Sequence, residues 1–120
     1  MEKLHIDAFP YSNGTKSQII QVRTLDTLKD SFVLQSPTLL KIDVQGFEIQ
    51  VLQGAKNILR DIDYIIIEMS FRKLYKDQGL FDEVYTVLNN NGFQFQGPLT
   101  QMDHPRTKEV LQIDGLFVKT

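Results

Sequence analysis

The sequence contains no cysteine among its 120 residues. A chain without thiols forms no disulfide scaffold, builds no cysteine-based zinc site and uses no thiol nucleophile. The composition is compatible with a reducing compartment, and we expect a cytoplasmic protein.

Long apolar segments and a targeting segment are also lacking. The longest apolar run covers residues 64–67, whereas a membrane-spanning helix needs about 20 apolar residues. The N-terminus lacks the basic and then apolar pattern of a signal peptide. We therefore predict no association with a membrane.

No charge of one sign dominates the chain. Thirteen Lys and Arg residues face 15 Asp and Glu residues, for a net charge of −2. Nucleic-acid binding needs a basic stripe, so the balance argues against it. A hydrophobic fraction of 42% in 120 residues fits one ordinary globular domain.

Residues 1–37 show the least regular pattern. Short apolar segments and an Asn-Gly dipeptide predict two short strands with a turn between them, at residues 4–8, 10–14 and 19–23. Thr24 or Asp26 is expected to cap a brief helical turn after them.

From residue 38 onward, strand-like and helix-like patterns alternate. The predicted order is a strand at 38–44, a helix from Phe47 that ends by Asp61, a strand at 64–68, a helix at 81–88 that ends at Gly92, a strand at 93–96, a loop at 97–108 and a strand at 110–119. Strands that alternate with helices favour a parallel sheet with right-handed crossovers. The last two strands have no helix between them, so we expect them to pair antiparallel.

Residues 39–48 read LLKIDVQGFE and residues 51–55 read VLQGA. This stretch closely resembles the signature of the FkbM-type methyltransferases. Three shorter motifs resemble other parts of that family in the same order: RTLDTL at 23–28, IIIE at 65–68 and QIDGLFV at 112–118. The resemblance covers residues 20–119.

The resemblance implies an α/β fold, the Rossmann-like sheet of class I methyltransferases with its antiparallel last strand. This chain would hold strands 4 to 7 of that sheet, and strands 1 to 3 would be absent. We expect residues 1–120 to form a single partial methyltransferase domain, with 1–37 as an irregular lead-in and 38–120 as the α/β part.

The implied cofactor is S-adenosylmethionine. In the family, a glycine-rich turn after the first strand and an acidic residue after the second hold it. No such turn occurs in this sequence, because Gly46 and Gly54 are too far apart and lie around a helix. We therefore assign no cofactor-binding residue and expect the isolated chain to lack this grip.

Asp43 and Glu68 are the candidate catalytic residues, since each lies where a predicted strand ends. Ligands of open α/β sheets bind at the carboxyl ends of the strands. Methylation of a hydroxyl requires loss of its proton, which Asp43 is predicted to accept while it orients the acceptor. Alternatively, both carboxylates cap neighbouring turns. Two oxygen ligands are too few to predict a metal site.

Several other polar residues are candidates for contact with the substrate: Gln45, Gly46, Ser70 and His104, with Tyr75 and Gln78 as further possibilities. His104 is a weak candidate for a catalytic base. Glu48 is better explained by its favourable place in the first turn of a helix. Lys41 either extends to solvent along an apolar surface or pairs with Asp43 or Glu68.

Two functions from different classes follow. The first is an S-adenosylmethionine-dependent methyltransferase that acts on a hydroxyl of a small molecule or sugar, as part of a larger domain. The second is an inactive remnant that serves as an interaction module or needs a partner chain. In either case a second copy or a partner would cover the exposed edge of the sheet.

Overall fold

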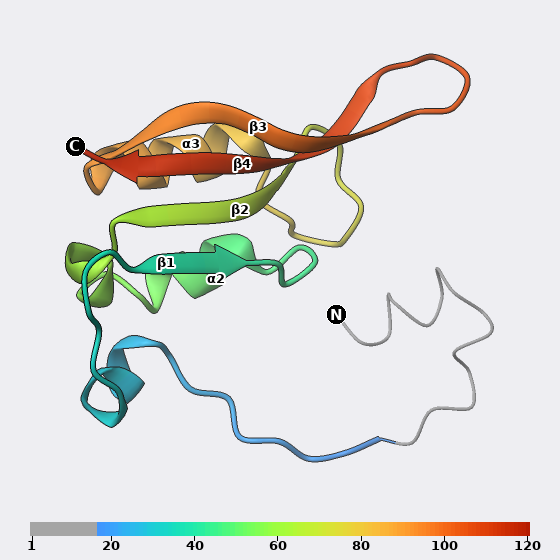
Figure 1. Ribbon diagram of the computed structural model, residues 1–120. Coiled ribbons are helices and arrows are strands. Elements are labelled where there is room, and N and C mark those ends of the chain that lie inside the picture. The colour runs from blue at the N-terminus through green and yellow to red at the C-terminus, as the bar shows by residue number, and fades with distance from the viewer. Residues whose placement is uncertain (1–16) are drawn as a thin grey trace.

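The computed structural model describes residues 17–120 as a mixed α/β unit around one four-stranded sheet (Figure 1). The strand predicted at 4–8 and the turn at 10–14 lie outside the described residues. The elements are the 3₁₀ helix η2 (Asp26–Ser31), β1 (Leu39–Ile42), α2 (Glu48–Gln53), the 3₁₀ helix η3 (Ile58–Asp61), β2 (Tyr64–Ser70), α3 (Phe81–Asn90), β3 (Phe93–Asp103) and β4 (Val110–Lys119).

The strands lie in the order β1-β2-β4-β3. β1 pairs parallel to β2, with Leu39 opposite Tyr64 and Ile42 opposite Ile67. β4 pairs antiparallel to both β2 and β3. These pairings confirm the predicted parallel neighbours and the predicted antiparallel closing pair.

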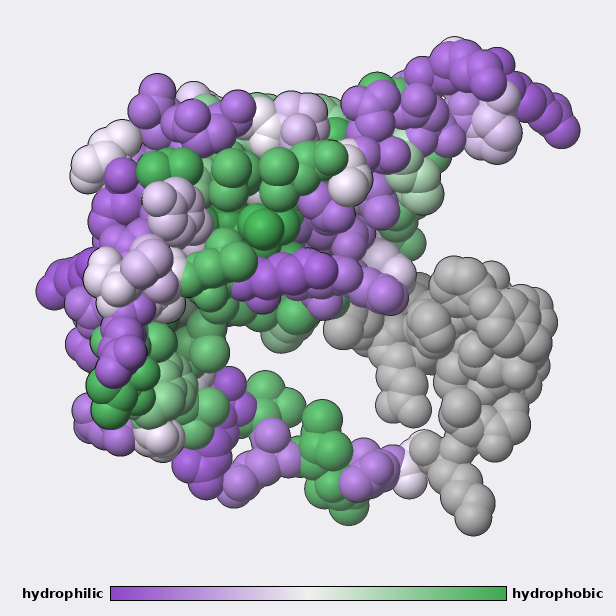
Figure 2. Space-filling view, in the orientation of Figure 1, coloured by the Kyte–Doolittle hydropathy of each residue, from purple (hydrophilic) through white to green (hydrophobic). Residues whose placement is uncertain are grey.

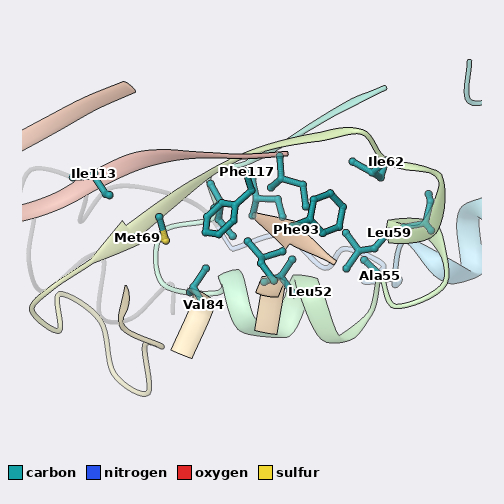
Figure 3. Packing of buried hydrophobic residues seen from close by; sticks show 14 residues of the cluster. Leu52, Ala55, Leu59, Ile62, Met69, Val84, Phe93, Ile113 and Phe117 are labelled. Atoms are coloured by element: carbon teal, nitrogen blue, oxygen red, sulfur yellow. The ribbon is translucent and has the colours of Figure 1, made fainter. Parts of the chain in front are cut away.

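The hydrophobic core lies between one face of the sheet and the helices α2 and α3 (Figure 3). Alternate residues of a strand point to the same face, so pairing of the strands gathers one apolar set there. The core consists of Ile42, Leu52, Ala55, Ile58, Leu59, Ile62, Ile65, Ile67, Met69, Val84, Leu88, Phe93, Ile113 and Phe117. Each large apolar side chain buried there contributes about 1.5–3 kcal/mol to stability.

The other side of the molecule is drawn in Figure 2, where hydrophobic residues gather over the strands. Leu39 and Tyr64 remain 55% and 40% exposed. The hairpin that joins β3 to β4 projects beyond the sheet and is hydrophilic (Figures 1 and 2).

The strand expected at residues 19–23 is not formed. Ile19 is fully exposed and the segment pairs with no other strand of residues 17–120. An apolar alternation needs a neighbouring strand to satisfy its backbone groups, and the sheet ends at β1.

The loop expected at residues 97–108 is also shorter than predicted, because β3 continues to Asp103. β3 is an edge strand, and its register shifts between Phe95 and Gly97 and again between Pro98 and Thr100. An edge strand tolerates proline because one side of its backbone needs no partner, and bulges absorb the irregular residues.

The first long helix is divided into α2 and η3, with a turn between them. Asp26 determines where the second piece begins, since its carboxylate accepts hydrogen bonds from the backbone N–H groups of Asn57 and Ile58 at 2.9–3.2 Å. Thr24 caps η2 as predicted, through a 3.2 Å hydrogen bond from the Thr27 N–H to its hydroxyl. Gly92 follows α3 with φ +85°, which confirms the predicted end of that helix.

Within residues 17–120, no helix combines the length and the apolar character needed to cross a bilayer.

Candidate active site

The turn between β1 and α2 is built on two residues with positive φ, Gln45 at 51° and Gly46 at 100°. A Cβ atom at Gly46 would lie 2.8 Å from the Cβ and Cδ2 atoms of Tyr75. Glycine is therefore required both by the backbone conformation and by the close approach of the tyrosine ring. The predicted tight turn at this dipeptide is confirmed.

Glu48 locks this turn from the first residue of α2. Its side chain is only 4% exposed, and its two carboxylate oxygens accept hydrogen bonds from the Gly46 N–H at 3.1 and 2.9 Å. Burial raises the pKa of Glu48, although hydrogen bonds from the backbone N–H groups of Gly46, Glu48 and Phe47 act in the opposite direction. Glu48 therefore stabilises the β1–α2 turn, while its predicted interaction with the helix dipole stays a prediction.

Asp43 and Glu68 come together at the carboxyl end of the sheet, because β1 and β2 run parallel. Burial raises the pKa of Glu68 to about 8, and a hydrogen bond with the Asp43 carboxyl group contributes next. The negative charges of Asp43, Glu48 and Asp114 raise it further. We call Asp43, Glu48, Glu68 and Asp114 the carboxylate site.

The raised pKa of Glu68 favours its protonated form near neutral pH, and a protonated Glu68 can donate a hydrogen bond to Asp43. Two interacting carboxyl groups lose their protons in two separate steps that belong to the pair. Such a pair holds one proton near neutrality while keeping one negative charge. It can accept a hydrogen bond from a hydroxyl and take up its proton.

Asp114 is a further member of the site, and the sequence pattern alone does not single it out. It lies directly opposite Glu68 in the antiparallel pairing of β2 with β4, and its carboxylate accepts a 2.8 Å hydrogen bond from the Thr100 hydroxyl. The available signal was the QIDGLFV motif, but only the register of β4 shows which residue faces Glu68.

Lys41 does not neutralise these carboxylates. Its side chain is exposed, and the ion pairs of residues 17–120 join Lys29 to Asp61 and Arg72 to Glu109. The alternative of a side chain that extends to solvent is therefore the one observed.

The segment between β2 and α3, residues 71–80, covers the β1–α2 turn. Tyr75 donates a hydrogen bond from its hydroxyl to Gln45 Oε1 at 2.9 Å. Burial raises the pKa of Tyr75, and the charges of Glu68, Glu48 and Asp43 raise it further. Tyr75 thus lies within the field of the carboxylate site.

Ser70 and His104 occupy different surroundings. Ser70 is fully buried, and its hydroxyl accepts a 2.8 Å hydrogen bond from Gln78 Nε2. His104 lies in the β3–β4 hairpin, where its Nδ1 accepts hydrogen bonds from the backbone N–H groups of Arg106 and Thr107. Contact of either residue with a substrate stays a prediction.

In the described part of the chain, no group of three or more His, Cys, Asp or Glu side chains is arranged to hold a metal ion.

Comparison with known proteins connects this geometry to a family. Residues 2–95 match the model of the methyltransferase FkbM domain. The chain belongs to the FkbM methyltransferase domain family. The match includes the β1–α2 turn, β2 and the segment over the turn, while the motif in β4 lies beyond it.

One curated relative is the hexuronic acid methyltransferase AglP of Haloferax volcanii, which is 34% identical over 64 residues. That alignment covers 48% of this chain and 27% of the relative, so the chain spans only part of the relative's length. No solved structure matches the chain.

The FkbM family implies S-adenosylmethionine, so the fit of this chain to the cofactor matters. Its seven glycines include no two that are separated by a single residue, as the glycine-rich turn of a Rossmann-like site requires. The space beside Gly46 is filled by Tyr75, and the Gly46 N–H already donates to the Glu48 carboxylate. This chain therefore contains no glycine-rich turn of the kind that holds the cofactor in a Rossmann-like site.

Proposed function

We propose that this chain supplies the acceptor side of an S-adenosylmethionine-dependent O-methyltransferase. The observation that carries the proposal is the Asp43–Glu68 pair at the carboxyl end of two parallel strands. A hydroxyl oxygen that gains a methyl group must lose its proton. In the proposed reaction, Asp43 accepts that proton, and Glu68 donates a hydrogen bond that orients the Asp43 carboxylate.

The strand arrangement supports this proposal. The order β1-β2-β4-β3, with antiparallel β4 between β2 and β3, is the order expected if these strands are strands 4, 5, 7 and 6 of a Rossmann-like methyltransferase sheet. In that arrangement the carboxylate site faces the crevice where open α/β sheets bind their ligands.

The proposed acceptor is a small molecule or sugar. The Haloferax volcanii relative is named for a hexuronic acid, and carboxylates are good acceptors for the hydroxyl groups of a sugar. The β1–α2 turn at Gln45 and Gly46 would form part of the acceptor site, with Ser70 and His104 retained as proposed contacts.

β1 lies at the edge of the sheet, and its outer side pairs with no other strand of residues 17–120. A groove of about 550 Å³ runs beside this strand, lined by apolar residues that include Val22, Leu40, Val44 and Val51. An unpaired strand next to an apolar groove needs cover from further strands, from a partner chain or from a second copy. We propose the cytosol as the compartment.

The acceptor role can be tested without turnover. In ¹⁵N-edited NMR spectra, a methyl glycoside of glucuronic acid or of glucose is titrated into the folded chain at millimolar concentration. We expect shifts of amide signals at residues 43–48, 68 and 114, and their loss in the Asp43→Asn variant. Shifts confined to other surfaces, or none, would contradict the acceptor site.

A parallel calorimetric titration with S-adenosylmethionine tests the cofactor side. We expect no binding heat from the chain alone, because it lacks the glycine-rich turn. Binding with micromolar affinity would show that the chain holds the cofactor by other residues and would overturn that part of the proposal.

A further inference from the structure

The segment at residues 71–80 is organised by one buried amide. Gln78 is 3% exposed, and its Oε1 accepts hydrogen bonds from the backbone N–H groups of Leu74 at 2.8 Å and Tyr75 at 3.3 Å. Its Nε2 donates to the Ser70 hydroxyl at 2.8 Å. The Gln78 side chain therefore ties the segment to the end of β2.

Tyr75 extends from this segment onto the β1–α2 turn. A Cβ atom added at Gly46 would lie 2.8–2.9 Å from the Cβ, Cγ and Cδ2 atoms of Tyr75. No space therefore remains between the two residues. Its hydroxyl donates to Gln45 Oε1. The ring is only half-buried, so part of it remains available to a ligand.

The two observations place an aromatic wall beside the carboxylate site. Phe71 and Leu74 of this segment remain 39% and 46% exposed, so burial of side chains holds it only in part, with Phe71 stacked on Phe81 at a centroid distance of 5.1 Å. Its shape is therefore expected to depend on the Gln78 hydrogen bonds. A buried amide that loses its partners is left with unsatisfied polar groups, and this cost favours one arrangement of the segment.

We propose that Tyr75 is a specificity-determining wall of the acceptor site and that Gln78 is the positioning residue that holds it there. This inference rests on the proposed acceptor function. A planar aromatic side chain next to hydroxyl-accepting carboxylates would recognise a sugar ring by its apolar C–H face, while the carboxylates bind the hydroxyl groups.

The positioning role has a test that needs no acceptor. Tyrosine labelled with ¹³C at Cζ reports the ionisation of each phenol, and the Tyr75→Phe variant identifies the signal of Tyr75. In the unaltered chain we expect the pKa of Tyr75 to lie above the ordinary value of a tyrosine. In Gln78→Met, the ring should move away from the carboxylates, and its pKa should shift down towards that ordinary value. A folded Gln78→Met protein with unchanged Tyr75 titration would overturn the positioning role.

Two further variants keep this test decisive. Ser70→Ala removes one of the Gln78 hydrogen bonds and leaves the two bonds to the backbone of Leu74 and Tyr75, so it should shift Tyr75 less than Gln78→Met does. It replaces Gln78→Met if that variant does not fold, and an unchanged Tyr75 signal then counts against the proposal. Lys73→Gln is the matched control, because it changes an exposed residue of the same segment and should leave the Tyr75 titration unchanged.

The wall is tested by the glycoside titration. Tyr75→Ala should weaken binding by roughly tenfold, as expected for the loss of one aromatic contact, and Tyr75→Phe should retain most of it. Unchanged affinity in Tyr75→Ala, with binding abolished in Asp43→Asn, would overturn the wall and leave the acceptor site intact. No binding to the unaltered chain would refute the acceptor function and the wall together, while the tyrosine titration would still decide the role of Gln78.

Discussion

Replacement of Glu68 by glutamine should make the chain more stable in mildly alkaline solution. The pKa of Glu68 in the folded protein is raised from 4.5 to about 8, so the folded state binds this proton more tightly than the unfolded chain. The stabilisation that protonated Glu68 contributes to folding is fully present below pH 4.5 and is lost as the pH rises through about 8. Glutamine has no proton to lose and escapes this penalty.

The magnitude follows from the size of the shift. A rise from 4.5 to about 8 corresponds to roughly 5 kcal/mol at full strength. Glu68 is only half-buried, and solvent screens its interaction with Asp43, Glu48 and Asp114, so about 1–2 kcal/mol remains. For a chain of this size the melting temperature of Glu68→Gln should exceed that of the unaltered chain by about 4–12 °C at about pH 8.5.

The assay is urea and thermal unfolding followed by circular dichroism at about pH 5 and about pH 8.5. The difference in unfolding free energy between Glu68→Gln and the unaltered chain should grow by about 1–2 kcal/mol between the two conditions. Asp30→Asn, at an exposed carboxylate of η2, serves as the control and should show the same difference at both. An equal difference for Glu68→Gln at both pH values would refute the reasoning about the carboxylate site.

Three other changes test separate parts of the structure. Gly46→Ala should destabilise the chain by about 2–3 kcal/mol in urea unfolding, because it combines a φ of 100° with contact against Tyr75; a loss below about 0.5 kcal/mol would contradict the described turn. Asp26→Ala removes the cap of η3 and should cost about 1–2 kcal/mol, with faster hydrogen exchange at the Asn57 and Ile58 amides, whereas unchanged exchange there would count against it. In an active methyltransferase containing this chain, Asp43→Asn should lower kcat/KM by at least about 100-fold at unchanged fold, and near-normal turnover would remove Asp43 from the proton transfer.

Much of the α/β part was predictable because its patterns are local. The helical period that placed Leu52, Ala55 and Leu59 on one buried face is confirmed, even though the helix is divided. Gly46 and Gly92 were recognisable because a positive φ strongly favours glycine. The FkbM signature indicated the family before any contact was known, and the comparison confirms it.

Two predictions of secondary structure were wrong, and in both cases the pairing of distant segments decides whether a strand forms. Residues 19–23 alternate like a strand but find no strand beside them, and residues 97–103 look like a loop but pair with β4. Hydrogen bonding between strands is a property of two segments, so neither result can be read from one of them.

Local sequence patterns predict the alternation of strands and helices, the glycine turn at the end of β1 and the membership of the FkbM family. The surroundings of that turn depend on contacts between distant segments. The parallel pairing of β1 with β2 brings Asp43 to Glu68, the register of β4 adds Asp114, and the Gln78 hydrogen bonds place Tyr75 over Gly46. Charge repulsion and burial act through space and not along the chain, so the raised pKa of Glu68 and the character of the carboxylate site exist only in the folded protein.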